Sequence, residues 1–451
     1  MDTLRGCRRA LDLGEETVMH LRLPKTRHGV LLGNVAARVA ALACVFAITL
    51  LLARDGGAAI VGVYALLHVL PGLIGTVISS GLPIAAPYFL AGPDRENPRL
   101  PATLVSIAFL GGAAGTILWV AAAPLFGPLV FGSLRLPLVM LAGVAVLTRL
   151  TVITAKACSQ GTDDLAGSNA VIFTEQFMFL PAYGSLWLAN VHGFTALIAS
   201  LLLADSATGT LAWSRLARRR FFGSLHPPSL QLARRIAAYG MRGQVGGVMS
   251  QLNLRLDFII LSVLTGPAVL GVYAVASKFA ELIRILGMAL QYVFYPKFAR
   301  ETSRETVATA RRLLPKAGLL SASALIPLWA SAGFVIPEFY GSAFASAVTP
   351  TRIILCGLAF DGVAGVISAS LYGLARPGLN SWAMGAGLVV TLVLDLTLIP
   401  PFGATGAAIA SAAAYSTTTG TLLLFFWWIG RMRSSKAAVD GALARADAGS
   451  R

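Results

Sequence analysis

The chain has 451 residues, of which 56% are hydrophobic and only 12% are charged, and its formal net charge is +16. About 25% of the residues of a soluble globular protein are charged. This composition therefore excludes an ordinary soluble domain and indicates a polytopic membrane protein. The four cysteines are scattered without paired spacing, so the sequence predicts neither a disulfide framework nor a metal site.

Apolar runs between helix-breaking residues predict twelve membrane-spanning helices. Each such helix needs about 20 mostly apolar residues. In chain order the predicted spans are 31–53, 60–90, 101–123, 137–156, 168–189, 193–214, 237–264, 268–294, 314–335, 349–373, 379–399 and 404–429. The first run lacks a small-residue cleavage pattern, so we expect a retained helix and not a signal peptide. The second run is long and contains three prolines, which predicts a tilt or a kink.

Lysine and arginine are distributed very unevenly between the predicted loops. If the N-terminus is cytoplasmic, the inside segments hold 27 of the 36 basic residues, and the outside loops hold only Arg54 and Arg135. Cytoplasmic loops of membrane proteins carry such an excess of positive charge. The bias predicts that both termini are cytoplasmic, and it assigns the basicity to membrane topology and anionic lipid, not to nucleic acid.

Two short motifs recur at one shared distance. "GVYA" at Gly62–Ala65 recurs at Gly271–Ala274, and "PLVFGS" at Pro128–Ser133 matches "PEFYGS" at Pro337–Ser342, both with an offset of 209 residues. This predicts two duplicated six-helix halves inserted in the same orientation, with a transport site between them. The predicted divisions are a basic N-terminal tail (1–29), an N-terminal bundle (30–216), a basic linker (217–236), a C-terminal bundle (237–430) and a C-terminal tail (431–451).

Three stretches carry a family pattern. In "LDLTLIPPFGATGAAIASAAAYS" (Leu394–Ser416) an apolar helix ends in a Pro-Gly turn and a small-residue helix follows; Leu254–Ile283 and Gly56–Leu67 are corresponding passages of the two halves. They resemble the polysaccharide transporter (Wzx-like) family of the multidrug/oligosaccharidyl-lipid/polysaccharide (MOP) exporter superfamily. The resemblance extends over about residues 30–430. It implies an all-α membrane protein of MATE-like fold, whose two pseudo-symmetric six-helix bundles open a central cavity to alternate sides.

The same resemblance implies a function. Members of this family translocate polyprenyl-diphosphate-linked oligosaccharides across the bacterial inner membrane for polysaccharide, lipopolysaccharide or exopolysaccharide biosynthesis. We therefore expect a multi-pass flippase of that membrane, without enzymatic activity or cofactor. Its expected partners are the lipid-linked oligosaccharide, membrane lipids and polysaccharide polymerase or assembly proteins, and not nucleic acid.

Two alternatives stay open. A cation-coupled multidrug exporter of the same superfamily would need an acidic cavity for cationic drugs, whereas the predicted spans contain seven basic and six acidic residues. A membrane enzyme of polysaccharide assembly would need a large outer loop or a catalytic motif, and no metal-binding aspartate pair or nucleophile motif stands out.

Charged residues inside the predicted spans are the candidates for the transport site, because charges at membrane depth normally face the protein interior or water. Arginine and lysine are the natural counterparts of a diphosphate. The first and seventh spans would be symmetry mates, which places Arg38 opposite Arg242 and Arg255. The candidate substrate-binding cations are Arg38, Arg149, Arg242, Arg255, Lys278 and Arg284. The candidate ion-coupling or structural acids are Asp257, Glu281, Asp361 and Asp395.

Spacing predicts how some of these side chains are arranged. Arg255 and Asp257 are two residues apart and point to nearly opposite sides of a helix, so we expect one to face the cavity and the other to bond a neighbouring helix. Lys278, Glu281 and Arg284 follow at i, i+3 and i+6, which predicts a salt-bridged stripe with one cation in excess.

Overall fold

The computed structural model describes residues 25–223 and 226–449, although some side chains within these ranges, including that of Arg242, are outside the description. All regular structure in this part of the chain is helical. The first half contains α2 (Lys25–Ile78), α3 (Leu82–Ala91), η1 (Pro93–Glu96), α4 (Leu100–Phe131), α5 (Leu136–Ala142), α6 (Val144–Gly161), α7 (Leu165–Phe177), α8 (Phe179–Leu188) and α9 (Gly193–Arg218). The second half contains α10 (Leu230–Thr265), α11 (Pro267–Phe298), α12 (Ser303–Tyr340), η2 (Ser342–Ala347), α13 (Val348–Gly357), α14 (Asp361–Gly373) and α15 (Pro377–Gly449).

Within the described residues, seven helical segments are long and apolar enough to cross a membrane, in agreement with a multi-pass membrane protein. Two of them each join two predicted spans. α2 contains the first span and most of the second across a kink at Gly57 (φ 71°), and α15 contains the eleventh and twelfth across a kink at Gly403 (φ 54°). Both glycines have the positive φ that other residues avoid. The second predicted span breaks between α2 and α3, and the fifth is split into α7 and α8.

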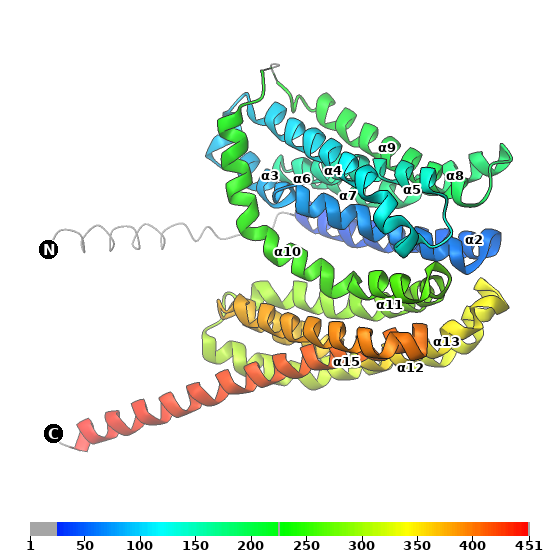
Figure 1. The fold of residues 1–451 in the computed structure, drawn as a ribbon. Helices are drawn as coiled ribbons and strands as arrows, with labels where there is room; N and C mark the ends of the chain where they lie inside the picture. Colours follow the sequence, from blue (N-terminus) through cyan, green and yellow to red (C-terminus); the bar gives the residue numbers. More distant parts are fainter. Residues whose placement is uncertain (1–24, 224–225, 450–451) are drawn as a thin grey trace.

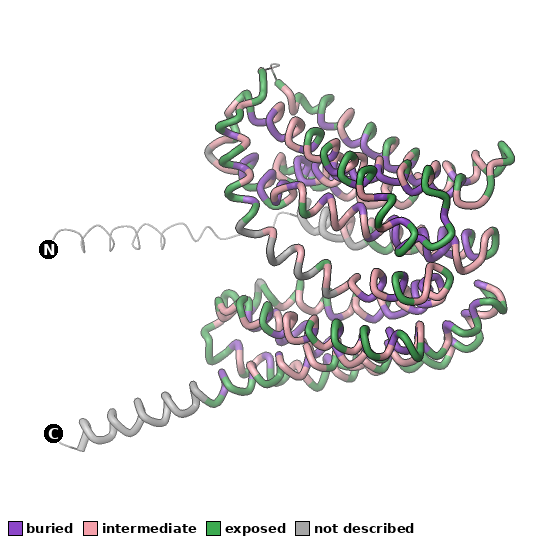
Figure 2. Tube along the Cα trace, in the orientation of Figure 1, coloured by how far each residue is buried: buried purple, intermediate pink, exposed green. Residues whose placement is uncertain are grey.

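The helices form two groups that lie side by side. Figure 1 shows the first half above the second, with α10 running from one group to the other. α10 packs against α3 and α4 of the first half and against α11 and α15 of the second. One buried core lies in the first half and the start of α10, a second lies in the second half, and a third, larger core joins the two halves. Buried residues occur along the helices of both groups (Figure 2). The predicted linker, 217–236, overlaps the start of α10, and the division into domains remains a prediction.

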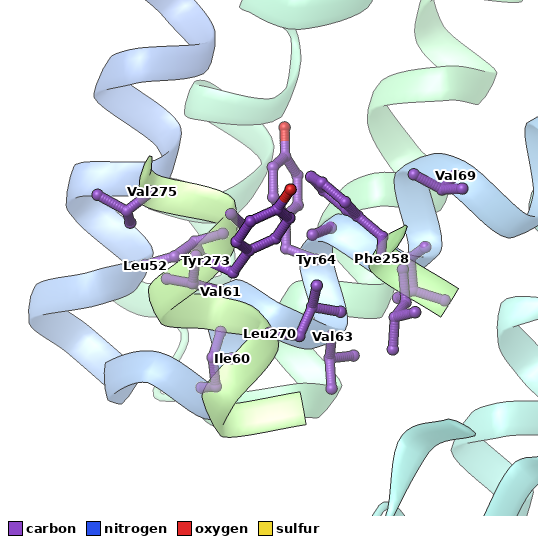
Figure 3. Close-up of a cluster of buried hydrophobic side chains, with 14 of the residues drawn as sticks. Leu52, Ile60, Val61, Val63, Tyr64, Val69, Phe258, Leu270, Tyr273 and Val275 are labelled. Carbon is purple, nitrogen blue, oxygen red and sulfur yellow. The ribbon is translucent and has the colours of Figure 1, made fainter. Parts of the chain in front are cut away.

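The repeated "GVYA" motifs meet where α2 crosses α11. A Cβ on Gly62 would lie 1.8 Å from the carbonyl oxygen of Pro267, and a Cβ on Gly271 would lie 1.8 Å from that of Ala58. Only glycine permits two helices to approach this closely. Tyr64 and Tyr273, from the same two motifs, are buried in the shared core (Figure 3). The two copies of the repeat therefore pack against each other between the halves.

The two halves are joined most tightly at one end. We call this the Gly57 end, and the opposite end, where α9 ends and α10 begins, the basic end. At the Gly57 end, Arg54 of α2 donates to the carbonyl oxygens of Glu338 (3.2 Å) and Phe339 (2.9 Å) of α12. The hydroxyl groups of Thr49 and Tyr340 are 3.1 Å apart. These bonds close the Gly57 end.

At the basic end the contacts between the halves run through α10. Arg235 of α10 forms a 3.0 Å ion pair with Asp94, and Tyr239 stacks on Tyr88 with ring centroids 4.1 Å apart. The first part of α10 is thus attached to the first half, while its later residues belong to the core shared with the second. This arrangement leaves α10 as the helix that must bend if the halves move.

Candidate functional site

A cavity of about 160 Å³ lies between the two halves, and we call it the central cavity. It is lined by α2 from the first half and by α10 and α11 from the second. Its polar lining residues are Thr49, Tyr64, His68, Gln251, Arg255 and Lys278. Pockets for drug-sized ligands usually measure about 300–1,000 Å³. In this conformation the cavity therefore accommodates a small anionic group and not an oligosaccharide.

The central cavity carries an excess of positive charge. Arg255 of α10 and Lys278 of α11 both donate to Glu281, with nitrogen–oxygen distances of 2.8 and 2.9 Å. The side chains of these three residues are between 18% and 27% exposed, so they are partly shielded from solvent. Two cations share one carboxylate, which leaves one positive charge unneutralised. The guanidinium of Arg255 also lies 5.2 Å from the ring centroid of Phe258, which helps to hold it in place.

Asp257 points away from the central cavity, into the second half. Its carboxylate accepts a 2.5 Å hydrogen bond from the hydroxyl of Tyr273 on α11 and a 3.3 Å bond from Ser411 on α15. The backbone N–H of Phe258 also donates to it, at 2.9 Å. The helical geometry expected from the spacing is therefore present: Arg255 faces the cavity and Asp257 bonds neighbouring helices. Asp257 connects three helices of the second half.

The predicted stripe of Lys278, Glu281 and Arg284 is wrong in its last member. Both oxygens of Glu281 are occupied by Lys278 and Arg255, and Arg284 turns instead toward Tyr415 of α15, 5.7 Å from its ring centroid. Arg284 lines a second cavity, of about 150 Å³, inside the second half. The reason is that Arg255, from another helix, has taken the second oxygen of Glu281, which leaves Arg284 to contact α15.

The second cavity also contains Asp361, at the first turn of α14. One of its oxygens, Oδ2, has no hydrogen-bond partner among the described residues. Arg284 faces the same cavity. The two side chains are thus close enough to influence each other, although no ion pair forms between them in this conformation.

Arg149 lies in the first half, on α6, and is buried. It pairs with Asp205 of α9 at 3.3 Å and donates to the carbonyl oxygen (2.8 Å) and the ring Nδ1 (3.0 Å) of His68. A guanidinium only donates, so Nδ1 of His68 must accept and the ring proton is on Nε2. His68 lines the central cavity, and Arg149 therefore acts on that cavity by orienting His68, without lining it.

The remaining predicted residues lie elsewhere. Arg38 is exposed, donates to Asn34 on its own helix at 2.9 Å and is not among the residues that line the central cavity. Arg242 lies on α10, with its side chain outside the described residues. Asp395 on α15 is fully buried, and neither carboxylate oxygen has a hydrogen-bond partner in the described part of the chain.

Four polar residues of the cavity lining were not predicted from the sequence. Thr49, Tyr64 and His68 of α2, and Gln251 of α10, line it without having been predicted. The repeat could have indicated one of them. At an offset of 209 residues His68 corresponds to Ser277, the residue next to the candidate Lys278, so His68 lies at the equivalent position of the first half.

The described residues contain no group of three or more histidine, cysteine, aspartate or glutamate side chains that could hold a metal ion. The central cavity itself is lined by charged, hydrogen-bonding and apolar side chains. The two cations, the neutral histidine and the surrounding hydroxyl and amide groups suit an anion such as a phosphate ester.

A match to a known protein family identifies the family of this chain. A family model described as "Polysaccharide biosynthesis protein" matches residues 109–349, which is more than half of the chain. The chain belongs to this family. Among curated proteins, this polysaccharide biosynthesis protein is 26% identical over 221 residues to a probable low-salt glycan biosynthesis flippase of Haloferax volcanii, a match that covers 48% of the chain and 46% of that flippase. The chain thus spans about half the length of its curated relative.

Solved structures establish the fold. The lipid II flippase MurJ, in an inward closed conformation, superimposes with a TM-score of 0.73 at 12% identity, over 88% of this chain and 86% of that one. An inward-facing MATE family transporter of the MOP superfamily gives 0.70 at 14% identity, over 89% and 95% of the two chains. An outward-facing MATE conformation gives a lower score, 0.62, at 13% identity over 90% and 95%. The predicted MOP fold is confirmed, and these neighbours are flippases and transporters, not enzymes.

Proposed function

We propose that this polysaccharide biosynthesis protein is a flippase that moves a polyprenyl-diphosphate-linked oligosaccharide across the membrane by alternating access. The observation that carries the proposal is the central cavity between the halves, where Arg255 and Lys278 share the single carboxylate of Glu281. Such an unneutralised cation suits a diphosphate. The polar head would pass between the halves while the lipid tail stays in the bilayer, and no bond would be broken.

Two further observations support this function. The curated relative is itself described as a glycan biosynthesis flippase, and the lipid II flippase shares the fold. The closed Gly57 end and the attachment through α10 at the basic end correspond to one state of an alternating-access cycle. The excess of positive charge in the central cavity opposes the alternative of an exporter for cationic drugs.

The distribution of basic residues supports a membrane location and an orientation for the flippase. We propose that it lies in the cytoplasmic (inner) membrane of a prokaryote with both termini on the cytoplasmic face, because 27 of the 36 basic residues would then be inside. The basic end would face the cytoplasm, where lipid-linked sugars are assembled. Polymerase and assembly proteins would then use the translocated oligosaccharide for polysaccharide, lipopolysaccharide or exopolysaccharide synthesis.

The buried acids of the second half are our candidates for coupling to a cation. An unpaired carboxylate away from water costs several kcal/mol, so Asp395 requires a proton or a cation in this conformation. Asp257 is by contrast held by Tyr273 and Ser411. We propose that Asp395 takes up the coupling cation and that Asp257 keeps α10, α11 and α15 in register around it. Glu281 and Asp361 have structural roles in this scheme.

The test of the flippase is deletion of the gene in its host, followed by mass spectrometry of the lipid-linked oligosaccharides and a probe of the leaflet that they occupy. Complete oligosaccharides should accumulate on the cytoplasmic leaflet. Wild type and Arg352→Gln should restore translocation, whereas Arg255→Gln should not. Arg352 is a matched control, because it lies in a predicted span but stacks on Trp329, outside the central cavity. Normal lipid-linked intermediates with altered drug sensitivity would instead favour the multidrug exporter.

A further inference from the structure

A groove lined by tyrosines lies at the basic end of the second half. It measures about 380 Å³ and is bordered by Met288, Gln291, Tyr292 and Tyr295 of α11 and by Tyr372 of α14. The side chains are open to the surroundings: Tyr292 is 67% exposed and Tyr295 is 47% exposed. Tyr295 and Tyr372 meet edge to face, with ring centroids 5.9 Å apart. None of the five lining residues is charged, in contrast to the central cavity.

The groove lies on the face of α11 that leads to the central cavity. Met288, Tyr292 and Tyr295 follow Glu281 by 7, 11 and 14 residues, and at about 100° per residue each lies within about 40° of it around the helix. Glu281 bonds Lys278 at the border of the cavity. With a rise of 1.5 Å per residue, Tyr292 lies about 17 Å farther toward the basic end.

A neighbouring face of α11 packs against α14, whose Tyr372 also borders the groove. The backbone of Gly287 lies against Gly365, and Phe298 lies against Gly373, so closely that a Cβ on either α14 glycine would clash. Tyrosines at membrane interfaces are often lipid-facing anchors. Tyr292 and Tyr295 share a face of α11 with Glu281 instead, and Glu281 bonds Arg255 and Lys278 of the central cavity.

The chemistry of the groove suits a sugar. A tyrosine ring offers a flat apolar surface for the C–H face of a pyranose, while its hydroxyl group exchanges hydrogen bonds with the sugar hydroxyls. The amide of Gln291 can donate and accept in the same groove. The volume is in the range of small-molecule sites.

We propose that the tyrosine groove binds the sugar part of a lipid-linked glycan, while the central cavity binds its diphosphate. This assignment rests on the proposed flippase function. Cargo entering from the basic end meets the groove on the face of α11 that carries Glu281, the residue bonded to both cations, so the two sites act on two chemically different parts of one molecule.

The test compares two ligands on the full-length protein in lipid nanodiscs. One is undecaprenyl diphosphate, which has no sugar; the other is the lipid-linked oligosaccharide extracted from the deletion strain. The double variant Tyr292→Leu/Tyr295→Leu should bind the glycan-linked lipid about tenfold more weakly and the sugar-free lipid as wild type does. Tyr292→Phe/Tyr295→Phe keeps the ring faces and should stay within about threefold of wild type for both ligands. Trp428→Leu, at an exposed aromatic residue outside the groove, should change neither affinity.

Three results would overturn the assignment. If the leucine variant weakens both ligands equally, the tyrosines serve the fold or anchor the protein in the membrane; if it weakens neither, the groove does not bind sugar. In both cases the flippase stands as long as Arg255→Gln weakens the sugar-free lipid. If wild type binds neither ligand, the flippase function fails, and the sugar site falls with it.

Discussion

Glu281 forms ion pairs with both cations of the central cavity, so the removal of its charge should increase the affinity for the cargo. In the structure its two oxygens accept bonds of 2.8 and 2.9 Å from Arg255 and Lys278. A diphosphate must displace at least one of these donors before it can bind. Glu281→Gln keeps the size of the side chain and an oxygen acceptor, but it weakens that competition.

The size of the effect follows from these bonds. A hydrogen bond to a charged group contributes about 1.5–3 kcal/mol net. Because the carboxylate is 25% exposed and only one donor needs to be released, the lower value applies. A gain of about 1.5 kcal/mol corresponds to roughly tenfold higher affinity for undecaprenyl diphosphate. Tighter binding mainly slows dissociation, so translocation in proteoliposomes should become slower.

The measurement is a binding isotherm for undecaprenyl diphosphate on wild type, Glu281→Gln and Glu338→Gln. The side chain of Glu338 is exposed and does not line the central cavity, so its variant should bind as wild type does. An unchanged or lower affinity of Glu281→Gln, with an unchanged melting temperature, would refute the competition. Glu281 would then serve to hold the two cations in position.

Three further changes test other parts of the structure. In Gly271→Ala the new Cβ would lie 1.8 Å from a carbonyl oxygen of α2, so the Gly57 end should open and the spin-label distance between the halves should increase. Gly72 of α2 has open space around it, so Gly72→Ala should leave that distance unchanged. Asp395→Asn should keep the melting temperature within a few degrees but abolish the acceleration of translocation by a cation gradient; retained acceleration would contradict its coupling role. The hydrogen bond from Arg215 lowers the pKa of Asp164, so its carboxylate stabilises the fold above its unfolded pKa of about 4, and that stabilisation is lost as the pH falls through the lower folded pKa. The free energy of unfolding of Asp164→Asn should therefore be about 1–2 kcal/mol lower than that of wild type at pH 7, and this difference should vanish in acid. A difference that does not depend on pH would exclude the ion pair as its cause.

The class of the molecule could be predicted from its sequence. Lipid leaves no water to satisfy the backbone, so long apolar runs become helices, and their approximate positions could be predicted from those runs, although the breaks within the second and fifth could not. The shared offset of 209 residues anticipated that Gly62 and Gly271 are equivalent, and the structure shows them packed at one crossing. Spacing also separated Arg255 from Asp257, because the direction of a side chain on one helix is a local property.

The pairing of the charged residues, by contrast, depends on how the helices pack. Glu281 bonds Arg255, 26 residues before it, and not Arg284, three residues after it. Arg149 reaches His68 across 81 residues, and Asp257 reaches Ser411 across 154. These partners depend on which helices pack together and on how each is rotated about its axis. One-dimensional spacing contains neither quantity, since both are set by the packing of all the side chains between the helices.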